Sequence, residues 1–346
     1  MILKGLSVQN IRSHEGRVID LSPTVTVITG NNGVGKTTLL EAVYVSLQGT
    51  SFKGVDNDIL QRGAPWYRID VKLDDDALRT VTFDPSRTSG KKRFTVDEKI
   101  SYRLPPKYKY PVVLFEPEDL RLLHGSPARR RQFIDHFIAQ IDPSYSTTLR
   151  KYERALKQRN ALLKKEFISE EDLFAWNISL SEYGAAIIEQ RVHAVEMINK
   201  ELNTYYHEIA HTEDEVTVHY SHTVIDHSAQ KLLRELESRF AYDRAVKHTS
   251  VGPHRHDIVF QFNDSPALSV ASRGEVRTIL LALKRIEASL IARTTGYHPV
   301  VLLDDVFSEL DKDRQDHIIE YFKDNQVIIS SATTLTYEGF LHVELE

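Results

Sequence analysis

The fold of this chain is decided by one glycine-rich stretch, Thr29-Gly30-Asn31-Asn32-Gly33-Val34-Gly35-Lys36-Thr37-Thr38. It fits the phosphate-loop pattern, in which a glycine is followed four residues later by Gly-Lys-Ser or Gly-Lys-Thr. The β-branched run before it, residues 24–29, predicts a strand, and the apolar spacing after it, over residues 37–47, predicts a helix. A strand, a glycine loop and a helix N-terminus together surround a phosphate with backbone N–H groups. We therefore predict that Lys36 reaches the β- and γ-phosphates of a nucleotide and that Thr37 ligates Mg²⁺.

Composition and charge place the chain among soluble globular proteins. Its 346 residues suffice for two compact units that share one sheet, or for two domains, and 41% of them are apolar and 27% charged. No apolar run is long enough for a membrane span, and residues 1–4 lead into a strand rather than a signal peptide. The absence of cysteine excludes disulfides, thiolate metal sites and cysteine nucleophiles. We therefore expect a cytoplasmic protein with no membrane contact.

Strands and helices are predicted along the whole chain from the spacing of its apolar residues. Arg12 lies between two strands, close to the strand that enters the loop, so we expect it to contact the nucleotide; a solvated loop arginine is the alternative. Helices are predicted from residue 126 onward and at residues 145–165, 169–209, 229–246 and 272–293. The predicted strands are residues 2–8, 17–21, 24–29, 67–73, 78–83, 93–96, 111–115, 215–221, 257–262, 300–305, 326–331 and 341–345.

Two segments are strongly basic although the net charge of the chain is −5. Residues 87–109 hold eight Lys or Arg against two acids, with tyrosines interleaved, which suits a phosphate backbone or a solvated hairpin edge equally. Residues 121–165 hold eleven Lys or Arg against three acids, including Arg129-Arg130-Arg131. Because this excess lies on predicted helices, it favours DNA as a partner over the alternative of solvated helix faces.

A second motif with chemistry is the apolar strand Val300-Val301-Leu302-Leu303, which ends in Asp304 and Asp305. A buried parallel strand places the carboxylate that follows it at the edge of the sheet where ligands bind. In phosphate-loop proteins that carboxylate holds Mg²⁺ together with the loop hydroxyl. We therefore expect Asp304 and Thr37 to hold Mg²⁺, and Asp305 to orient or deprotonate the attacking water as a catalytic residue.

A third motif, Ser272-Arg273-Gly274-Glu275, opens the long amphipathic helix that precedes this strand. Ser272 is a good N-cap, and Gly274 allows the backbone to approach a ligand closely. A helix N-terminus of this kind can bind an anion, which makes the motif a second anion site, far in sequence from the first.

These three motifs, in this order, resemble those of the ABC-type ATPase heads. Four further segments accompany them: Phe115-Glu116-Pro117-Glu118-Asp119-Leu120, Gly125-Ser126-Pro127 with Arg129-Arg130-Arg131, Gly252-Pro253-His254-Arg255, and Leu302-Leu303-Asp304-Asp305-Val306-Phe307-Ser308-Glu309-Leu310-Asp311. Together they resemble the RecF family of bacterial DNA replication and repair proteins, over nearly the whole chain.

The resemblance implies an α/β fold, an ABC-type P-loop ATPase head with a mixed sheet and a central helix. The head would comprise residues 1–115 and 272–346, with a largely helical lobe, residues 116–271, inserted before the signature motif. It also implies weak, DNA-stimulated ATP hydrolysis with Mg²⁺, and a homodimer that forms with ATP on double-stranded or gapped DNA. RecR is an implied partner, and RecO and the loading of RecA are further implied steps in DNA repair, replication and the SOS response.

The same resemblance implies a role for each motif residue. The loop Gly30–Thr38 would bind ATP, Asp304 would coordinate Mg²⁺, and Asp305 would take the position of the catalytic base. Ser272-Arg273-Gly274 would be the signature that touches the γ-phosphate held by a second copy of the chain, and residues 308–311 would be the loop at the dimer seam.

The chain departs from the expected motifs in four respects. Glu275 stands where the signature usually has glutamine, and His256 where an aspartate usually follows the Gly-Pro-His-Arg run. Ser331-Ala332-Thr333 occupies the place of the switch histidine of transporter ATPases, and no glutamine of the Q-loop kind is evident. Sensing of the γ-phosphate is therefore not assigned to a residue.

The sequence admits three other interpretations. An architectural DNA-tethering head of the SMC kind would need sustained heptads for a long arm, and only about 40 helical residues around 169–209 are available. A phosphotransferase kinase would need neither a signature helix nor a dimer. His207-Glu208-Ile209-Ala210-His211 matches the zinc-protease pattern but has no clear third ligand, so we expect a surface helix end there.

Overall fold

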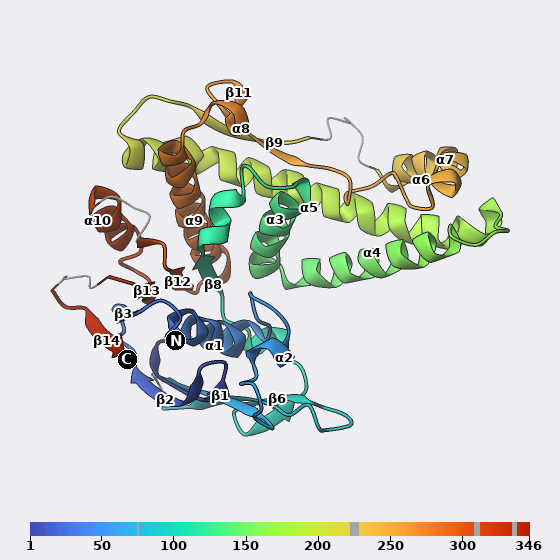
Figure 1. The fold of residues 1–346 in the computed structure, drawn as a ribbon. Helices are drawn as coiled ribbons and strands as arrows, with labels where there is room; N and C mark the ends of the chain where they lie inside the picture. Colours follow the sequence, from blue (N-terminus) through green and yellow to red (C-terminus); the bar gives the residue numbers. More distant parts are fainter. Residues whose placement is uncertain (75, 222–227, 308–311, 334–337) are drawn as a thin grey trace. The chain divides into compact units, whose positions relative to one another are not determined.

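The computed structural model describes the whole chain except residues 75, 222–227, 308–311 and 334–337 (Figure 1). It divides into two compact units. The first unit is Met1–Asp119 with Glu287–Glu346, and the second unit is Leu120–Ile286. The sequence predicted the ATPase lobe to resume at residue 272, whereas the chain returns to the first unit within a helix, at residue 287. The assignment of a function to each lobe stays a prediction.

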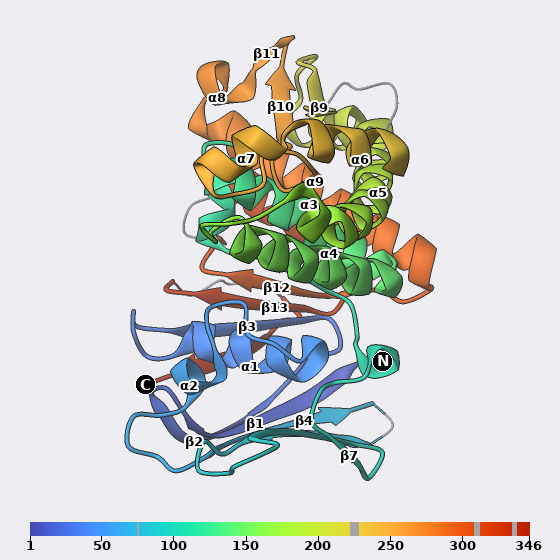
Figure 2. The ribbon, with the colours of Figure 1, turned by 90° about the vertical axis from the view of Figure 1, so that its right-hand side faces the viewer.

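The first unit contains two sheets with a helix between them (Figure 2). The six-stranded sheet is antiparallel, in the order β2 (His14–Asp20), β1 (Leu3–Ile11), β4 (Tyr67–Leu73), β5 (Leu78–Phe83), β6 (Lys92–Val96) and β7 (Lys99–Ser101). The five-stranded sheet is parallel, in the order β14 (Leu341–Leu345), β3 (Val25–Gly30), β13 (Val327–Ser331), β12 (Val300–Asp304) and β8 (Val112–Phe115).

The helix between the sheets is α1 (Lys36–Gln48), and almost all of its side chains are buried. The predicted apolar positions Leu39, Leu40, Val43 and Leu47 are each at most 1% exposed. A helix that is covered on every side needs no polar face, which explains its weak amphipathicity. The prediction of a central helix is confirmed.

The parallel strands β12 and β13 are buried at every position, and α1 packs against both of them. Burial of both faces is typical of parallel sheets. This burial explains why both strands form continuous apolar runs in the sequence. Along the sequence, β12 and β13 are separated by α10 (Lys312–Tyr321), a helix that was not predicted. The remaining short elements of this unit are α2 (Asp56–Ile59) and two 3₁₀ helices, Pro106–Tyr108 and Pro117–Arg121.

The second unit is mainly helical, as predicted. Helices α4 (Pro143–Leu162) and α5 (Glu170–Ala210) lie side by side as a helical hairpin (Figure 1). Ser169 caps α5 in a capping box with Asp172, and His211 ends it in the left-handed conformation. The unit also contains α3 (Pro127–Ile141), α6 (Ala229–Ser238), α7 (Phe240–Val246), α8 (Ala267–Val270), part of α9 (Arg273–Thr295), and the antiparallel sheet β11 (Ser265–Pro266), β10 (Ile258–Phe262) and β9 (Val216–Tyr220).

One predicted helix is wrong. Residues 229–246 form two helices, α6 and α7, because Arg239 has a non-helical backbone between them. The break accompanies an internal ion pair: Asp243 of α7 is fully buried, and it binds Arg159 of α4 at 2.7 Å. Within the described part of the chain, no helix has both the length and the apolar character to cross a membrane.

Candidate functional site

The phosphate loop connects the end of β3 to the start of α1 and depends on its glycines. Gly30, Gly33 and Gly35 have φ angles of 149°, 88° and 104°, which side-chain-bearing residues rarely adopt. A Cβ on Gly35 would lie 2.3 Å from Nε2 of His14, and one on Gly30 would lie 2.5 Å from the carbonyl oxygen of Leu345. Glycine at position 30 is therefore required by space as well as by conformation, because the clash is with backbone, whereas at position 35 the conformation is the stricter requirement.

Lys36, the first residue of α1, folds back across this loop. Its ammonium donates hydrogen bonds to the carbonyl oxygens of Gly30, at 2.8 Å, and Asn31, at 3.1 Å, and the residue is 6% exposed. The positive charge is thus held within the loop, next to the backbone N–H groups of the helix N-terminus. This is where a phosphate group would need a cation.

The structure brings Thr37 and Asp304 together across 267 positions of sequence. The Thr37 hydroxyl donates to Oδ1 of Asp304 at 2.6 Å, and the Ser330 hydroxyl donates to the same oxygen at 2.8 Å. Sheet register explains the meeting: Asp304 pairs with Ser330 between β12 and β13, and Ser331 pairs with Thr29 between β13 and β3. The three strands therefore end at the same edge of the sheet, directly at the loop.

The groups at this edge suit Mg²⁺. Thr37 gives its proton to Asp304, so the lone pairs of its hydroxyl oxygen can face a cation, and Asp304 offers a carboxylate that is 2% exposed. Both are the hard oxygen ligands that Mg²⁺ prefers. In the part of the chain that the structure describes, no cluster of three His, Asp or Glu could hold a metal ion by itself. The metal would thus rely on one carboxylate, one hydroxyl and the phosphates of the nucleotide.

Asp305 follows directly and is held by its backbone. Its φ angle is 52°, in the left-handed region, and its N–H donates to the Ser330 hydroxyl at 2.9 Å. This conformation turns the chain directly after β12, so that Asp305 leaves the sheet. The role of Asp305 as a base toward water stays a prediction.

Arg12 contacts α1 rather than open solvent. Its guanidinium binds Glu41 at 2.8 Å, and Glu41 is 1% exposed and also accepts a hydrogen bond from the Ser51 hydroxyl at 2.5 Å. Arg12 therefore neutralises the buried carboxylate of Glu41, which lies on α1, more than one turn after Lys36. Whether it also contacts a nucleotide stays a prediction.

Four residues of this site were not predicted: His14, Glu41, Lys53 and Ser330. His14 forms a hydrogen bond to the carbonyl oxygen of Gly35 at 3.1 Å, and Lys53 lies 3.3 Å from Oδ2 of Asp304. Ser330 stands next to Asp304 only through the parallel register of two strands. A small hydroxyl residue at the end of the buried strand 327–331 was the one available signal for Ser330.

The signature residues Ser272, Arg273 and Gly274 lie in the second unit, at the start of α9. Ser272 and Glu275 form reciprocal hydrogen bonds: the Ser272 N–H donates to Oε2 of Glu275 at 2.5 Å, and the Glu275 N–H donates to the Ser272 hydroxyl at 3.3 Å. Glu275, which replaces the usual glutamine, thus completes a capping box. The contact of these residues with a γ-phosphate stays a prediction.

The arginine cluster 129–131 is used differently from the expectation. Arg130 binds both carboxylate oxygens of Asp257, at 2.8 and 2.7 Å, and the carbonyl oxygen of Gly125 at 2.8 Å. Arg131 donates to the carbonyl oxygen of His256 at 2.7 Å. These two arginines hold the loop 249–257 in place, so they are not free surface charges.

His256 has a structural role in the same loop. The two histidines of the zinc-protease pattern also have local structural roles. His256 is hydrogen-bonded through Nδ1 to the Tyr220 hydroxyl at 2.7 Å. His207 bonds the carbonyl oxygen of Asp214, Glu208 pairs with Arg285, and His211 is the left-handed C-cap of α5. The two histidines therefore bond or cap the end of α5, and Glu208 pairs with an arginine of α9.

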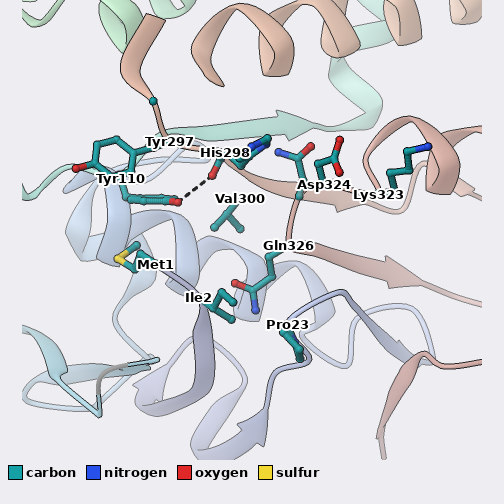
Figure 3. A pocket seen from close by; sticks show the side chains of 12 residues that line it. Met1, Ile2, Pro23, Tyr110, Tyr297, His298, Val300, Lys323, Asp324 and Gln326 are labelled. Atoms are coloured by element: carbon teal, nitrogen blue, oxygen red, sulfur yellow. Dashed lines mark hydrogen bonds between the residues drawn. The ribbon is translucent and has the colours of Figure 1, made fainter. Parts of the chain in front are cut away.

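A cavity of about 300 Å³ in the first unit lies away from these residues (Figure 3). Its lining includes Val300 and Gln326, at the amino ends of β12 and β13, whereas Asp304 is at the carboxyl end. The Tyr110 hydroxyl donates to the carbonyl oxygen of His298 on its wall at 2.9 Å. The cavity thus opens at the sheet edge opposite to the phosphate loop.

Comparisons with known proteins agree with this geometry. A family model described as AAA domain matches residues 6–239. The curated "DNA replication and repair protein RecF" of Streptococcus agalactiae (serotype V) is 33% identical, with 100% of this chain and 95% of that protein covered. The protein of the same name from Clostridium perfringens (strain SM101) is 33% identical, with 95% and 92% covered.

Solved structures show the same likeness. A structure of "the recombination mediator protein RecF-ATP in RecFOR pathway" superposes with a TM-score of 0.87 at 28% identity, over 97% of this chain and 93% of that one. An SMC head bound to the C-winged helix domain of ScpA has a TM-score of 0.54 at 14% identity, over 96% of this chain and 90% of that one. The second likeness concerns the fold alone.

Proposed function

Because the chain belongs to the RecF family of DNA replication and repair proteins, we propose that it is an ATPase of recombinational DNA repair that binds DNA and forms a homodimer with ATP. A related protein has been solved as a RecF-ATP structure in the RecFOR pathway, which supports ATP as the nucleotide. RecR, RecO and RecA are the proposed partners, and the cytoplasm is the proposed location. The fold is that of a P-loop ATPase head.

One observation carries the proposal: the hydrogen bond of 2.6 Å between Thr37 and Asp304. It joins the end of the phosphate loop to the end of β12, so a hydroxyl and a carboxylate converge on one point beside Lys36. Neither a glycine turn nor an apolar strand requires this meeting by itself. The arrangement fits the binding of a nucleotide triphosphate with its metal.

The residues of the site have distinct tasks in this proposal. Backbone N–H groups of the loop and the ammonium of Lys36 bind the phosphate oxygens and neutralise charge that develops on them. Thr37 and Asp304 would hold Mg²⁺, which when bound supplies further charge neutralisation at the phosphates. Asp305 would orient the attacking water and accept its proton. Ser330 holds the Asp304 carboxylate and the Asp305 backbone in position.

The DNA contact is proposed on α4. Arg150, Lys151, Arg154 and Lys157 form what we call the α4 basic ridge; all four are exposed, whereas Arg159 of the same helix is fully buried. Residues spaced three and four apart share one helix face. Glu153 is the single acid of the helix, so the face carries an excess of positive charge over about 10 Å of helix length. This suits consecutive phosphates of a DNA backbone.

Replacement of Lys36 or Asp304 tests the ATPase proposal. Lys36→Ala and Asp304→Asn should each lower the rate of ATP hydrolysis by about 10²-fold or more, because each removes a group that stabilises charge in the transition state. Lys36→Ala should also weaken ATP binding. Phosphate release and nucleotide binding would be measured on the full chain, with the exposed Lys200→Ala as the control. Turnover by Lys36→Ala at the rate of the unmodified protein would show the proposal to be wrong.

A further inference from the structure

Asp304 already has a cation beside it. The ammonium of Lys53 lies 3.3 Å from Oδ2 of Asp304, with side chains that are 34% and 3% exposed. Lys36 is occupied with the carbonyl oxygens of Gly30 and Asn31. Among the residues that the structure describes, Lys53 is thus the only cation paired with this carboxylate.

The Lys53–Asp304 ion pair compensates a buried negative charge, but it also opposes the binding of a metal ion to the same carboxylate. A buried carboxylate without a neighbouring cation is costly, so Lys53 stabilises Asp304 when no metal is bound. The oxygens of Asp304 have a full set of neighbours: Oδ1 accepts the hydroxyls of Thr37 and Ser330, and Oδ2 faces Lys53. A divalent cation on the same carboxylate would stand close to the ammonium and repel it.

We propose that Lys53 is the resident counter-ion of Asp304 and that it leaves this carboxylate when a magnesium nucleotide binds. Lys53 and the metal then compete for one carboxylate, so Lys53 sets the metal concentration at which the site is filled. The inference rests on the proposed function, since it requires that Asp304 serves a metal nucleotide.

The backbone around Lys53 is fixed, so the exchange is confined to its side chain. The Ser51 hydroxyl oxygen accepts hydrogen bonds from the N–H groups of Lys53, at 2.8 Å, and Gly54, at 3.0 Å. The same hydroxyl donates to Glu41 on α1 at 2.5 Å, which ties the segment to the central helix.

The side chain of Lys53 also contacts the ring of Phe52. Its ammonium lies 5.9 Å from the ring centroid of Phe52, a cation–π distance, and the Phe52 ring is itself in contact with Tyr44. Rotation about the bonds of the lysine side chain is enough to carry the charge from Asp304 toward solvent along this ring. The lysine can therefore leave without a loop movement.

The experiment compares Lys53→Met with the unmodified full chain. Mn²⁺ binding in the presence of ADP, followed by electron paramagnetic resonance, should become tighter by about two- to fivefold, which corresponds to the strength of a partly exposed ion pair. Without nucleotide and metal, Lys53→Met should have a lower Tm because Asp304 loses its cation. With saturating Mg²⁺ and ADP this difference should disappear.

Two controls make the outcomes separable. Lys53→Arg keeps the positive charge and should bind Mn²⁺ like the unmodified chain, and Lys200→Met removes an exposed lysine of α5 and should change nothing. Equal or weaker Mn²⁺ binding by Lys53→Met would overturn the inference, as would a Tm deficit of the same size in both states. If the unmodified chain does not bind Mn²⁺ and ADP at all, the proposed function itself fails.

Discussion

At the scale of single residues, His254 shows how burial fixes a protonation state in the second unit. Nε2 donates to the carbonyl oxygen of Thr249 at 3.1 Å, which leaves Nδ1 of the neutral ring to accept the Tyr152 hydroxyl at 2.6 Å. Burial, and then the nearby charges of Arg255 and Arg131, lower the pKa of His254 to about 4. The loop 249–257 is therefore held by an uncharged histidine at neutral pH.

This pKa has a consequence for stability. Between pH 6.5 and about 4 the unfolded chain binds a proton at His254 that the folded chain does not, so the free energy of unfolding falls as the pH falls through this window. The contribution of one such group is at most about 1.4 kcal/mol per pH unit. Urea unfolding at several pH values should show a shallower dependence for His254→Gln than for the unmodified protein.

The control for this measurement is His193→Gln, an exposed histidine on α5. It should keep the pH dependence of the unmodified chain. A slope that is identical in His254→Gln and the unmodified protein would mean that His254 is protonated in the folded state.

At the scale of elements, α4 separates arginines that hold the fold from basic residues that face solvent. Arg159 is buried against Asp243, Asn177 and Thr249, whereas the α4 basic ridge is exposed. Changing Arg154 and Lys157 together to Gln should reduce the salt slope of DNA binding by about 2, because each lost phosphate contact removes about 0.9 from it. Fluorescence anisotropy of gapped DNA at several salt concentrations measures this slope.

The matched comparison is Arg130→Gln, which removes an internal ion pair instead. It should lower the free energy of unfolding, since Asp257 would lose its partner. The double change on the ridge should leave stability nearly constant, as is usual for exposed side chains. An unchanged salt slope for the ridge variant would contradict a DNA contact on α4.

The sequence was sufficient to locate the strands and helices that have a strong apolar periodicity or that flank the glycine motif. The strands 67–73 and 78–83 are found at the predicted bounds, and α1, α5 and α9 differ from the prediction by at most two residues at each end. The break at Arg239 was missed because nothing local opposes helix there; a tertiary ion pair at Asp243 accompanies it. Contacts made by sheet register, such as that of Ser330 with Asp304, follow from no spacing in the sequence, and a hydroxyl residue at the end of a buried strand was the only signal for Ser330.

The internal contacts of Arg130 and Arg131 were missed for a similar reason. Charge density along the sequence identifies a basic segment, but it does not say which guanidiniums face carbonyl oxygens and carboxylates inside the fold. The candidate site was therefore predicted where a loop and a strand end define it, and was incomplete where packing supplies Glu41 and Lys53.

At the scale of the whole molecule, the proposed function requires two copies of the chain. Arg273, at the start of α9, is the predicted signature residue, and in the proposed function its loss should block ATP-induced dimerisation while one chain still binds nucleotide. Ser272 is a poorer choice for this test, because its side chain caps the helix and its replacement would also cost helix stability. Light scattering of Arg273→Ala with ATP should therefore report the mass of a single chain.

The exposed Arg244→Ala on α7 serves as the control and should dimerise normally. Nucleotide binding by Arg273→Ala, measured in parallel, should match that of the unmodified chain. A dimer of Arg273→Ala with ATP would contradict the signature assignment and leave the phosphate-loop assignment untouched.

The order of strands in the parallel sheet has a consequence for biosynthesis. β3 leads into the phosphate loop and lies between β13 and β14 in the sheet. These two neighbouring strands lie within the last 20 of the 346 residues. At about 5–20 residues per second, a ribosome needs on the order of 15–60 s after β3 to produce its neighbours. During this interval β3 lacks both of its neighbours in the sheet. The phosphate loop can therefore take up its final position only after the strands β13 and β14 have been synthesised.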